Sequence, residues 1–268
     1  MLIVGELINS TRKAIRPAIE NRDVAFIQNL AQKQSNAGAH YIDCNAATVG
    51  IEKEPEMLPW VIQKVQEVVD LPCAIDSPNA TAMLAALEVH KGKPMINSIT
   101  AEQEKMNSLL PVIQKTECKV IALCMGDGGM PRDVDERMKN ARILVEQLRS
   151  AGVADGDIYL DFLVCPVSTD GRYGSMVIDT IRCMKLEFPD VQTVCGLSNV
   201  SFGLPERKWV NRAFMVLTMG AGLDAVIIDP LDPVMMALIY ATEVTLGKDE
   251  FCMEYLMAAR CGKLDGLR

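Results

Sequence analysis

Eight short apolar runs rich in β-branched residues recur along the 268 residues of this chain, and a longer segment with helical periodicity follows each run. That alternation is typical of parallel strands joined by crossover helices. An open doubly wound sheet would share it, but eight units spread over the whole length favour closure into a barrel. No Pro-, Gly- or Ser-rich linker divides the chain. The sequence therefore predicts an α/β fold with one domain, a single (β/α)8 TIM barrel over residues 1–268.

The strands are expected where the apolar runs are shortest and most β-branched, at residues 2–5, 41–44, 73–75, 95–96, 120–125, 158–160, 193–197 and 225–228. Between them, apolar residues recur every three or four positions and form stripes that can pack on a barrel. These stripes predict helices at 24–37, 57–69, 80–89, 133–148, 176–188, 209–219 and 233–244. The segment 102–115 is less regular.

The charge balance excludes some classes of protein. Lysine and arginine number 27 against 35 acidic residues, for a formal charge of -8, which argues against nucleic-acid binding. No apolar run approaches the roughly 20 residues of a membrane helix and no signal-peptide pattern is present, so a cytoplasmic protein without membrane binding is expected. Nine cysteines without a C-x-x-C pair fit buried reduced thiols. The two histidines, His40 and His90, lie far apart, so no protein-bound metal is expected.

Polar side chains follow the apolar runs at seven of the eight expected strand ends, where active sites of this fold are built. They are Glu6 and Asn9, Asp43 and Asn45, Asp76, Asn97, Asp161, Ser198 and Asn199, and Asp229. One aspartate after a strand is most often a cap for the next helix, and for Asp229 that role is expected. Capping alone does not predict asparagines at the ends of "MINS" and "GLSN".

A rim of carboxylates and carboxamides matches a flat heterocycle with several N–H donors beside ring nitrogens and a carbonyl, because carboxylates accept and asparagine both donates and accepts. A pterin is such a molecule. Its 2-amino group and N3–H form a parallel donor pair that one carboxylate can accept in bidentate fashion. Phosphate fits poorly, since the chain has no Gly-rich phosphate loop followed by Lys-Ser/Thr.

Several segments resemble, in order, those of the pterin-binding methyltransferases. They are "IVGELIN" at the start, "YIDCNA", "AIDSPN", "MINS", and "GLSNVSFGLP" followed by "NR". The family includes methyltetrahydrofolate:corrinoid/iron-sulfur protein methyltransferase, the folate module of cobalamin-dependent methionine synthase and the methyltransferases of demethylase systems. "GLSNVSFGLP" is long enough to be specific, and the similarity runs over essentially the full length.

The resemblance implies that Asp76, Asn97 and Asp161 hydrogen-bond the pterin ring and that Asn199 faces N5. When N5 is the leaving group it must gain positive charge. An asparagine cannot be a general acid near neutral pH, so Asn199 is expected to stabilise the transition state by hydrogen bonding while water supplies the proton.

Other site residues are implied less directly. Asp43 and Asn45 would support the pocket from the same rim, which Glu6 also reaches. Ser198 is a further candidate, and so is Arg207, because the matching loop of the family carries a basic residue near the pocket mouth. A surface position at a helix entry is the alternative for Arg207.

The function implied is methyltransfer between N5 of methyltetrahydrofolate and the cobalt of a corrinoid. The chain has no Asp-x-His-x-x-Gly motif, so the corrinoid is expected on a partner protein, and a homodimer is common in the family. Two alternatives are a dihydropteroate synthase-like enzyme, whose Lys and Arg-x-His elements are missing here, and a catalytically silent folate-binding protein. The direction of transfer is not readable, although a stand-alone chain favours, by analogy, demethylation systems in which folate receives the methyl group.

Overall fold

The computed structural model describes residues 1–265 and contains a closed barrel of eight parallel strands, each paired with its neighbours in chain order. The strands are β1 (Leu2–Asn9), β2 (Tyr41–Asn45), β3 (Cys73–Asp76), β4 (Met95–Ala101), β5 (Lys119–Gly126), β6 (Ile158–Asp161), β7 (Gln192–Gly196) and β8 (Ala225–Ile228). The predicted (β/α)8 TIM barrel is confirmed.

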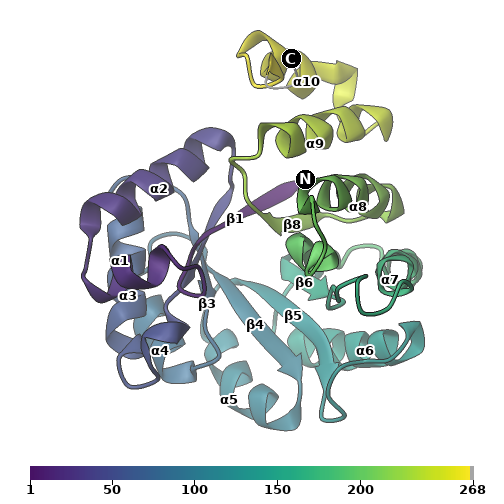
Figure 1. Cartoon of the computed structure of the whole chain (residues 1–268). Coiled ribbons are helices and arrows are strands. Elements are labelled where there is room, and N and C mark those ends of the chain that lie inside the picture. The colour runs from purple at the N-terminus through teal and green to yellow at the C-terminus, as the bar shows by residue number, and fades with distance from the viewer. Residues whose placement is uncertain (266–268) are drawn as a thin grey trace.

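Helices surround the strands, and α10 lies outside α9 at the edge of the molecule (Figure 1). They are α1 (Ile15–Glu20), α2 (Val24–Ala37), α3 (Glu54–Gln66), α4 (Ala80–Val89), α5 (Gln103–Ile113), α6 (Val134–Ser150), α7 (Tyr173–Glu187), α8 (Arg207–Ala221), α9 (Pro233–Thr245) and α10 (Met253–Arg260). The irregular segment 102–115 forms α5. The short helices α1 and α10 have no counterpart among the predicted helices.

Two strands continue at least four residues beyond their predicted ends. The apolar run of β1 stops at Gly5, but the strand extends to Asn9 through a register shift against β2. Strand β4 similarly continues past two register shifts to Ala101. Such irregularities change the direction of side chains at barrel rims. They were not predictable from the sequence, because a polar residue directly follows each apolar run and looks like the start of a loop.

The barrel interior is closed by a compact apolar layer that takes one residue from each strand. Its members are Val4, Tyr41, Ala74, Met95, Ile121, Tyr159, Val194 and Ala225. A second, larger apolar core lies between the outer faces of the strands and the helices. Because side chains alternate between the two faces of a strand, the layer fixes which later residues point into the barrel.

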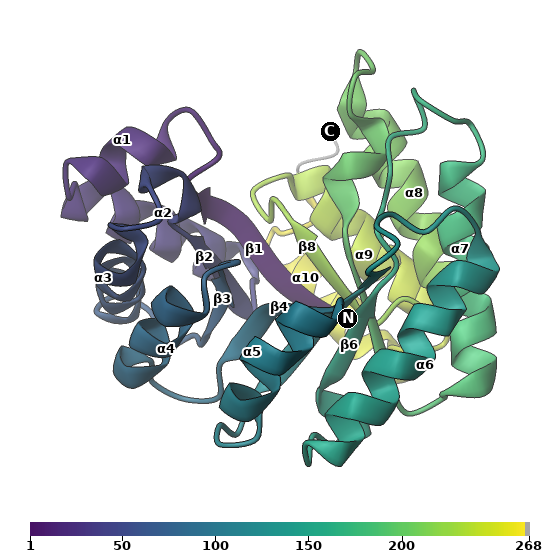
Figure 2. The ribbon, with the colours of Figure 1, turned by 90° about the horizontal axis from the view of Figure 1, so that it is seen from below.

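The loops that leave the carboxyl ends of β6 and β7 lie against each other. Val167 N–H donates to the Val200 carbonyl at 3.0 Å, and Ser168 Oγ donates to the Phe202 carbonyl at 2.7 Å. Figure 2 shows these segments on the same side of the molecule as the start of α8. Across residues 1–265, no helix combines the length and apolar character needed to cross a membrane.

Candidate active site

The polar residues predicted at the strand ends form a ring in the barrel mouth. Two residues beyond each member of the apolar layer, the next inward side chain reaches the carboxyl end of its strand. In strand order these positions are Glu6, Asp43, Asp76, Asn97, Leu123, Asp161, Gly196 and Ile227. The register places Asp76 beside Asn97 and Leu123 beside Asp161. One ring therefore contains five of the predicted site residues, namely Glu6, Asp43, Asp76, Asn97 and Asp161.

One side of the ring is a network of acids bridged by amides. Asn97 Nδ2 donates to Asp43 Oδ1 at 3.1 Å, and Asn45 Nδ2 donates to Asp76 Oδ2 at 3.0 Å. Asn9 Nδ2 lies between the two acids, 3.2 Å from Asp76 Oδ2 and 3.5 Å from Asp43 Oδ2. Each carboxylate keeps lone pairs that no protein group takes, which leaves acceptors for a ligand.

Burial controls the protonation of these acids. It raises the pKa of Asp43, which is 2% exposed, well above its usual range, with repulsion from Asp76 adding to the effect. Burial likewise raises the pKa of Asp76 to about 6, although the hydrogen bond from Asn45 opposes it. No basic side chain hydrogen-bonds either acid in the described part of the chain, so a ligand that brings N–H donors would stabilise their charged forms.

Asp161 stands across the ring from this network. Its Oδ1 accepts the Leu163 N–H at 2.7 Å, and the backbone N–H of Gly196 also donates to the carboxylate. Burial nevertheless raises the pKa of Asp161 to about 6. The two backbone donors fix the carboxylate without neutralising it, and lone pairs remain for a further donor.

Asn199 lies above the only ring position without a side chain. Gly196 ends β7, and a Cβ atom there would lie 3.7 Å from Asn199 Nδ2. Asn199 itself is exposed in a 3-10 turn over Leu197–Ser201. The carboxamide therefore lies at the edge of the mouth, beside the inward position that Gly196 leaves without a side chain.

A side hollow of about 220 Å³ adjoins the mouth and is lined in part by Glu6, Ser198 and Arg207. Arg207 Nε donates to Ser201 Oγ at 2.9 Å, and its NH2 group donates to the Ser198 carbonyl at 2.5 Å. Arg207 thus clamps the Asn199 turn and also lines the hollow. Glu6 pairs with Arg12 at 2.6 Å, yet burial raises the pKa of Glu6.

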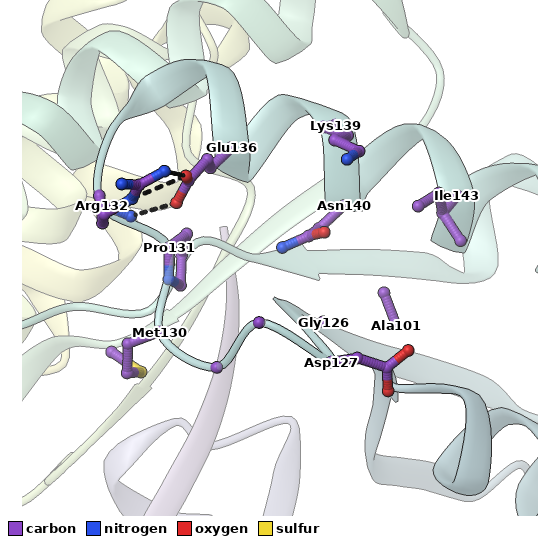
Figure 3. Close-up of a pocket in the computed structure, with 12 residues that line it drawn as sticks. Ala101, Gly126, Asp127, Met130, Pro131, Arg132, Glu136, Lys139, Asn140 and Ile143 are labelled. Atoms are coloured by element: carbon purple, nitrogen blue, oxygen red, sulfur yellow. Dashed lines mark hydrogen bonds and ion pairs between the residues drawn. The ribbon is translucent and has the colours of Figure 1, made fainter.

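A larger hollow of about 420 Å³ lies between the β5–α6 loop and α6 (Figure 3). Arg132 and Glu136 pair with each other there, and Asn140 Nδ2 donates to the Cys124 carbonyl at 3.0 Å. None of the ring residues lines this hollow. The predicted polar residues gather at the mouth and not in this hollow, so the mouth is the better candidate site.

The family model for pterin binding enzymes matches residues 5–229 of this chain. The chain belongs to the pterin-binding enzyme family. The matched span runs from Gly5 in β1 to Asp229 after β8 and so contains every residue of the ring.

Two curated relatives of this pterin-binding chain are a methyltransferase and a methionine synthase. The methylcorrinoid:tetrahydrofolate methyltransferase of Eubacterium limosum is 35% identical over 266 residues, which cover 98% of each chain. The methionine synthase of Mycobacterium tuberculosis is 29% identical over 241 residues, which cover 85% of this chain and 20% of that protein.

Solved structures of similar fold are dihydropteroate synthases. The enzyme from Clostridium difficile, in the presence of pteroic acid, has a TM-score of 0.68 at 20% identity, covering 91% of this chain and 96% of its own. The enzyme from Xanthomonas albilineans, in complex with 7,8-dihydropteroate, has a TM-score of 0.62 at 18% identity, covering 93% of each chain. At these identities the likeness shows the fold of the pterin-binding barrel and no more.

One predicted role in this pterin-binding barrel is wrong. Asp229 was expected to cap the helix after β8, but Asp232 is the N-cap of α9 and accepts the N–H groups of Val234 and Met235. Asp229 instead accepts the Leu231 N–H at 2.8 Å. This bond closes a short turn within the loop. Three residues separate Asp229 from the first residue of α9, Pro233, so the carboxylate cannot serve as its N-cap.

Asn9 was expected at the strand-end rim without an assigned role, and Gly196 was not among the expected site residues. Asn9 bridges Asp43 and Asp76, and its place at the end of β1 depends on the strand continuing past its apolar run. Gly196 supplies a backbone donor and an empty inward position. The signal for Gly196 was present, since it lies two residues beyond Val194 in β7.

Proposed function

We propose that this protein transfers a methyl group between the cobalt of a corrinoid carried by a partner protein and N5 of tetrahydrofolate bound in the barrel mouth. The observation that carries the proposal is the inward ring of Asp43, Asp76, Asn97 and Asp161 at a mouth edged by Asn199. The name of the Eubacterium limosum relative, which matches over 98% of each chain, supports the same reaction.

The ring fits a pterin through its acceptors. Asp161 is held by two backbone N–H groups and keeps lone pairs for the parallel 2-amino and N3–H donors of the pterin. Asp76 Oδ2 is occupied by amide donors, whereas its second oxygen is available for a further N–H. Asn97, fixed by its bond to Asp43, can use its carbonyl oxygen toward the ring.

Asn199 is the group proposed to face N5. In the direction toward folate, the N5 lone pair forms a bond to the methyl carbon and the N5 proton leaves to water. The carboxamide can accept from N5–H before transfer and donate to N5 in the reverse reaction, but it cannot itself take or give a proton near neutral pH. Asn199 therefore orients N5 and stabilises its changing charge.

The corrinoid supplies the methyl group and keeps the electron pair of the cleaved cobalt–carbon bond. This chain offers no imidazole at the mouth to hold it. His40 Nδ1 accepts the Ile3 N–H at 3.0 Å and His90 Nε2 accepts the Cys73 N–H at 2.8 Å, both at the amino ends of strands. That placement supports a corrinoid delivered by a partner.

The direction, the domain extent, the assembly and the location belong to the same proposal. We take tetrahydrofolate as the methyl acceptor, following the order of substrates in the name of the Eubacterium limosum relative. We treat residues 1–268 as one methyltransferase domain that forms a homodimer, for which an apolar groove of about 520 Å³ between α7 and α8 is the supporting feature. Nine free cysteines support a cytoplasmic location.

The test is anaerobic incubation with methylcobalamin and tetrahydrofolate, and then with reduced cobalamin and methyltetrahydrofolate, while the cobalt spectrum is followed. Enzyme-dependent loss of the methylcobalamin spectrum, with formation of methyltetrahydrofolate, is expected. Saturable folate binding without transfer in either direction would instead identify a silent binding protein, and condensation of p-aminobenzoate with a pterin would identify a synthase.

A further inference from the structure

Arg137 on α6 is a buried cation whose acceptors are not carboxylates. It is 0% exposed and is the largest of the fully buried side chains. Its guanidinium donates to the carbonyls of Phe162 and Asp133 and contacts the Met176 sulfur. Burial lowers the pKa of Arg137. A cation placed this way costs folding free energy that an apolar side chain of the same size would not.

The stability of the core does not account for this arginine. The Nη2 nitrogen of Arg137 is buried and has no hydrogen-bond partner in the described chain. An apolar residue would fill the same space without leaving that donor unpaired. The hydrogen bonds of its other two nitrogens, Nε and Nη1, therefore have to explain why a guanidinium occupies this position.

What Arg137 holds is the peptide next to a ring carboxylate. Its Nε donates to the Phe162 carbonyl at 2.8 Å, and Phe162 directly follows Asp161. The next residue, Leu163, has a left-handed backbone with φ of 62° and donates its N–H to Asp161 Oδ1. The turn is therefore hydrogen-bonded on both sides, by Arg137 from helix α6 and by the Asp161 carboxylate from the barrel mouth.

We propose that Arg137 is a positioning residue for pterin binding that acts through Asp161, an inference that rests on the proposed function. By fixing the Phe162 carbonyl, Arg137 keeps Leu163 in a conformation that non-glycine residues disfavour. The Leu163 N–H then stays aimed at Asp161, whose remaining lone pairs stay free for a further donor. Without the guanidinium the turn relaxes and the carboxylate loses its fixed orientation.

The experiment is a double-mutant cycle on tetrahydrofolate binding, measured anaerobically by calorimetry with Arg137→Met, Asp161→Ala and the double variant. Arg137→Met is expected to raise the Kd about tenfold, and to raise it no further when Asp161 is already alanine. Thermal unfolding checks that each variant folds. Arg137→Gln, which is too short to reach the Phe162 carbonyl, replaces Arg137→Met if the latter does not fold.

The control is Asn140→Ala. Asn140 also lies on α6 (Figure 3). It donates to the carbonyl of Cys124 in β5, where the neighbouring inward residue is the apolar Leu123. Its Kd for tetrahydrofolate should match the wild-type value. A wild-type Kd for Arg137→Met, or an undiminished loss in the Asp161→Ala background, overturns the role of Arg137. A wild-type Kd for Asp161→Ala instead overturns the proposed pterin contact itself.

Discussion

At the scale of single residues, Asn199 and Asp161 are expected to fail in different ways when they are replaced. Asn199 is exposed at the edge of the mouth, whereas Asp161 is buried in the ring. Asn199→Ala removes a group that matters most while the charge on N5 changes, so turnover should fall about 100-fold while the Kd for folate changes little. Single-turnover kinetics beside calorimetry separate the two quantities. An equal loss in both would make Asn199 a binding residue only.

The proposed contact between Asp161 and the pterin predicts that folate binding depends on pH. Burial raises its pKa to about 6, so in the free protein the carboxyl group is protonated below that pH and accepts poorly. The affinity for folate should therefore fall as the pH is lowered through about 6, and Asp76, with a similar pKa, adds a second proton to the slope. Asp161→Asn should retain only the shallower slope. Calorimetric affinities that are flat between about pH 5 and 8 would contradict this assignment.

At the scale of elements, strand β1 depends on a contact between Gly5 and helix α2. Gln34 Oε1 accepts the Leu7 N–H at 3.0 Å, and a Cβ on Gly5 would lie 2.4 Å from the same oxygen. Gly5→Ala should displace Gln34, leave the Leu7 N–H unpaired and cost about 1–3 kcal/mol of unfolding free energy. Chemical denaturation measures the loss. Gly128→Ala, with no atom within 4 Å of its new Cβ, is the control, and equal stability of the two variants would refute the contact.

Local patterns in the sequence predicted some of these elements, whereas contacts between distant segments decided others. Helices α2 and α4 have the predicted bounds, because their apolar stripes and caps are local patterns. The ring acids were predictable because each follows an apolar run at the carboxyl end of its strand. The extension of β1 to Asn9 was not, since it depends on a register shift against β2. The cap of α9 was also predictable, because Asp232 directly precedes the predicted helix 233–244 and Pro233 occupies its first position, whereas Asp229 lies three residues farther away.

At the scale of the whole molecule, the groove between α7 and α8 is the surface proposed to join two copies. Trp209 lines it and is 66% exposed, with the Arg212 guanidinium 5.1 Å from the centre of its ring, and Leu217 is 57% exposed. No ring residue lines the groove. Trp209→Glu would bury a charge at the interface and should convert a dimer to a monomer that still binds folate.

Light scattering after size-exclusion chromatography measures that change in mass, and Leu186→Glu provides the matched control. Leu186 is 87% exposed on α7 but does not line the groove, so the same substitution there should leave the dimer intact. A wild-type protein that is monomeric at micromolar concentration would contradict the assembly, and a dimer that survives Trp209→Glu would move the interface to another face. Loss of folate binding in a monomeric Trp209→Glu variant would instead mean that the second copy supports the mouth, because the substituted side chain lies outside it.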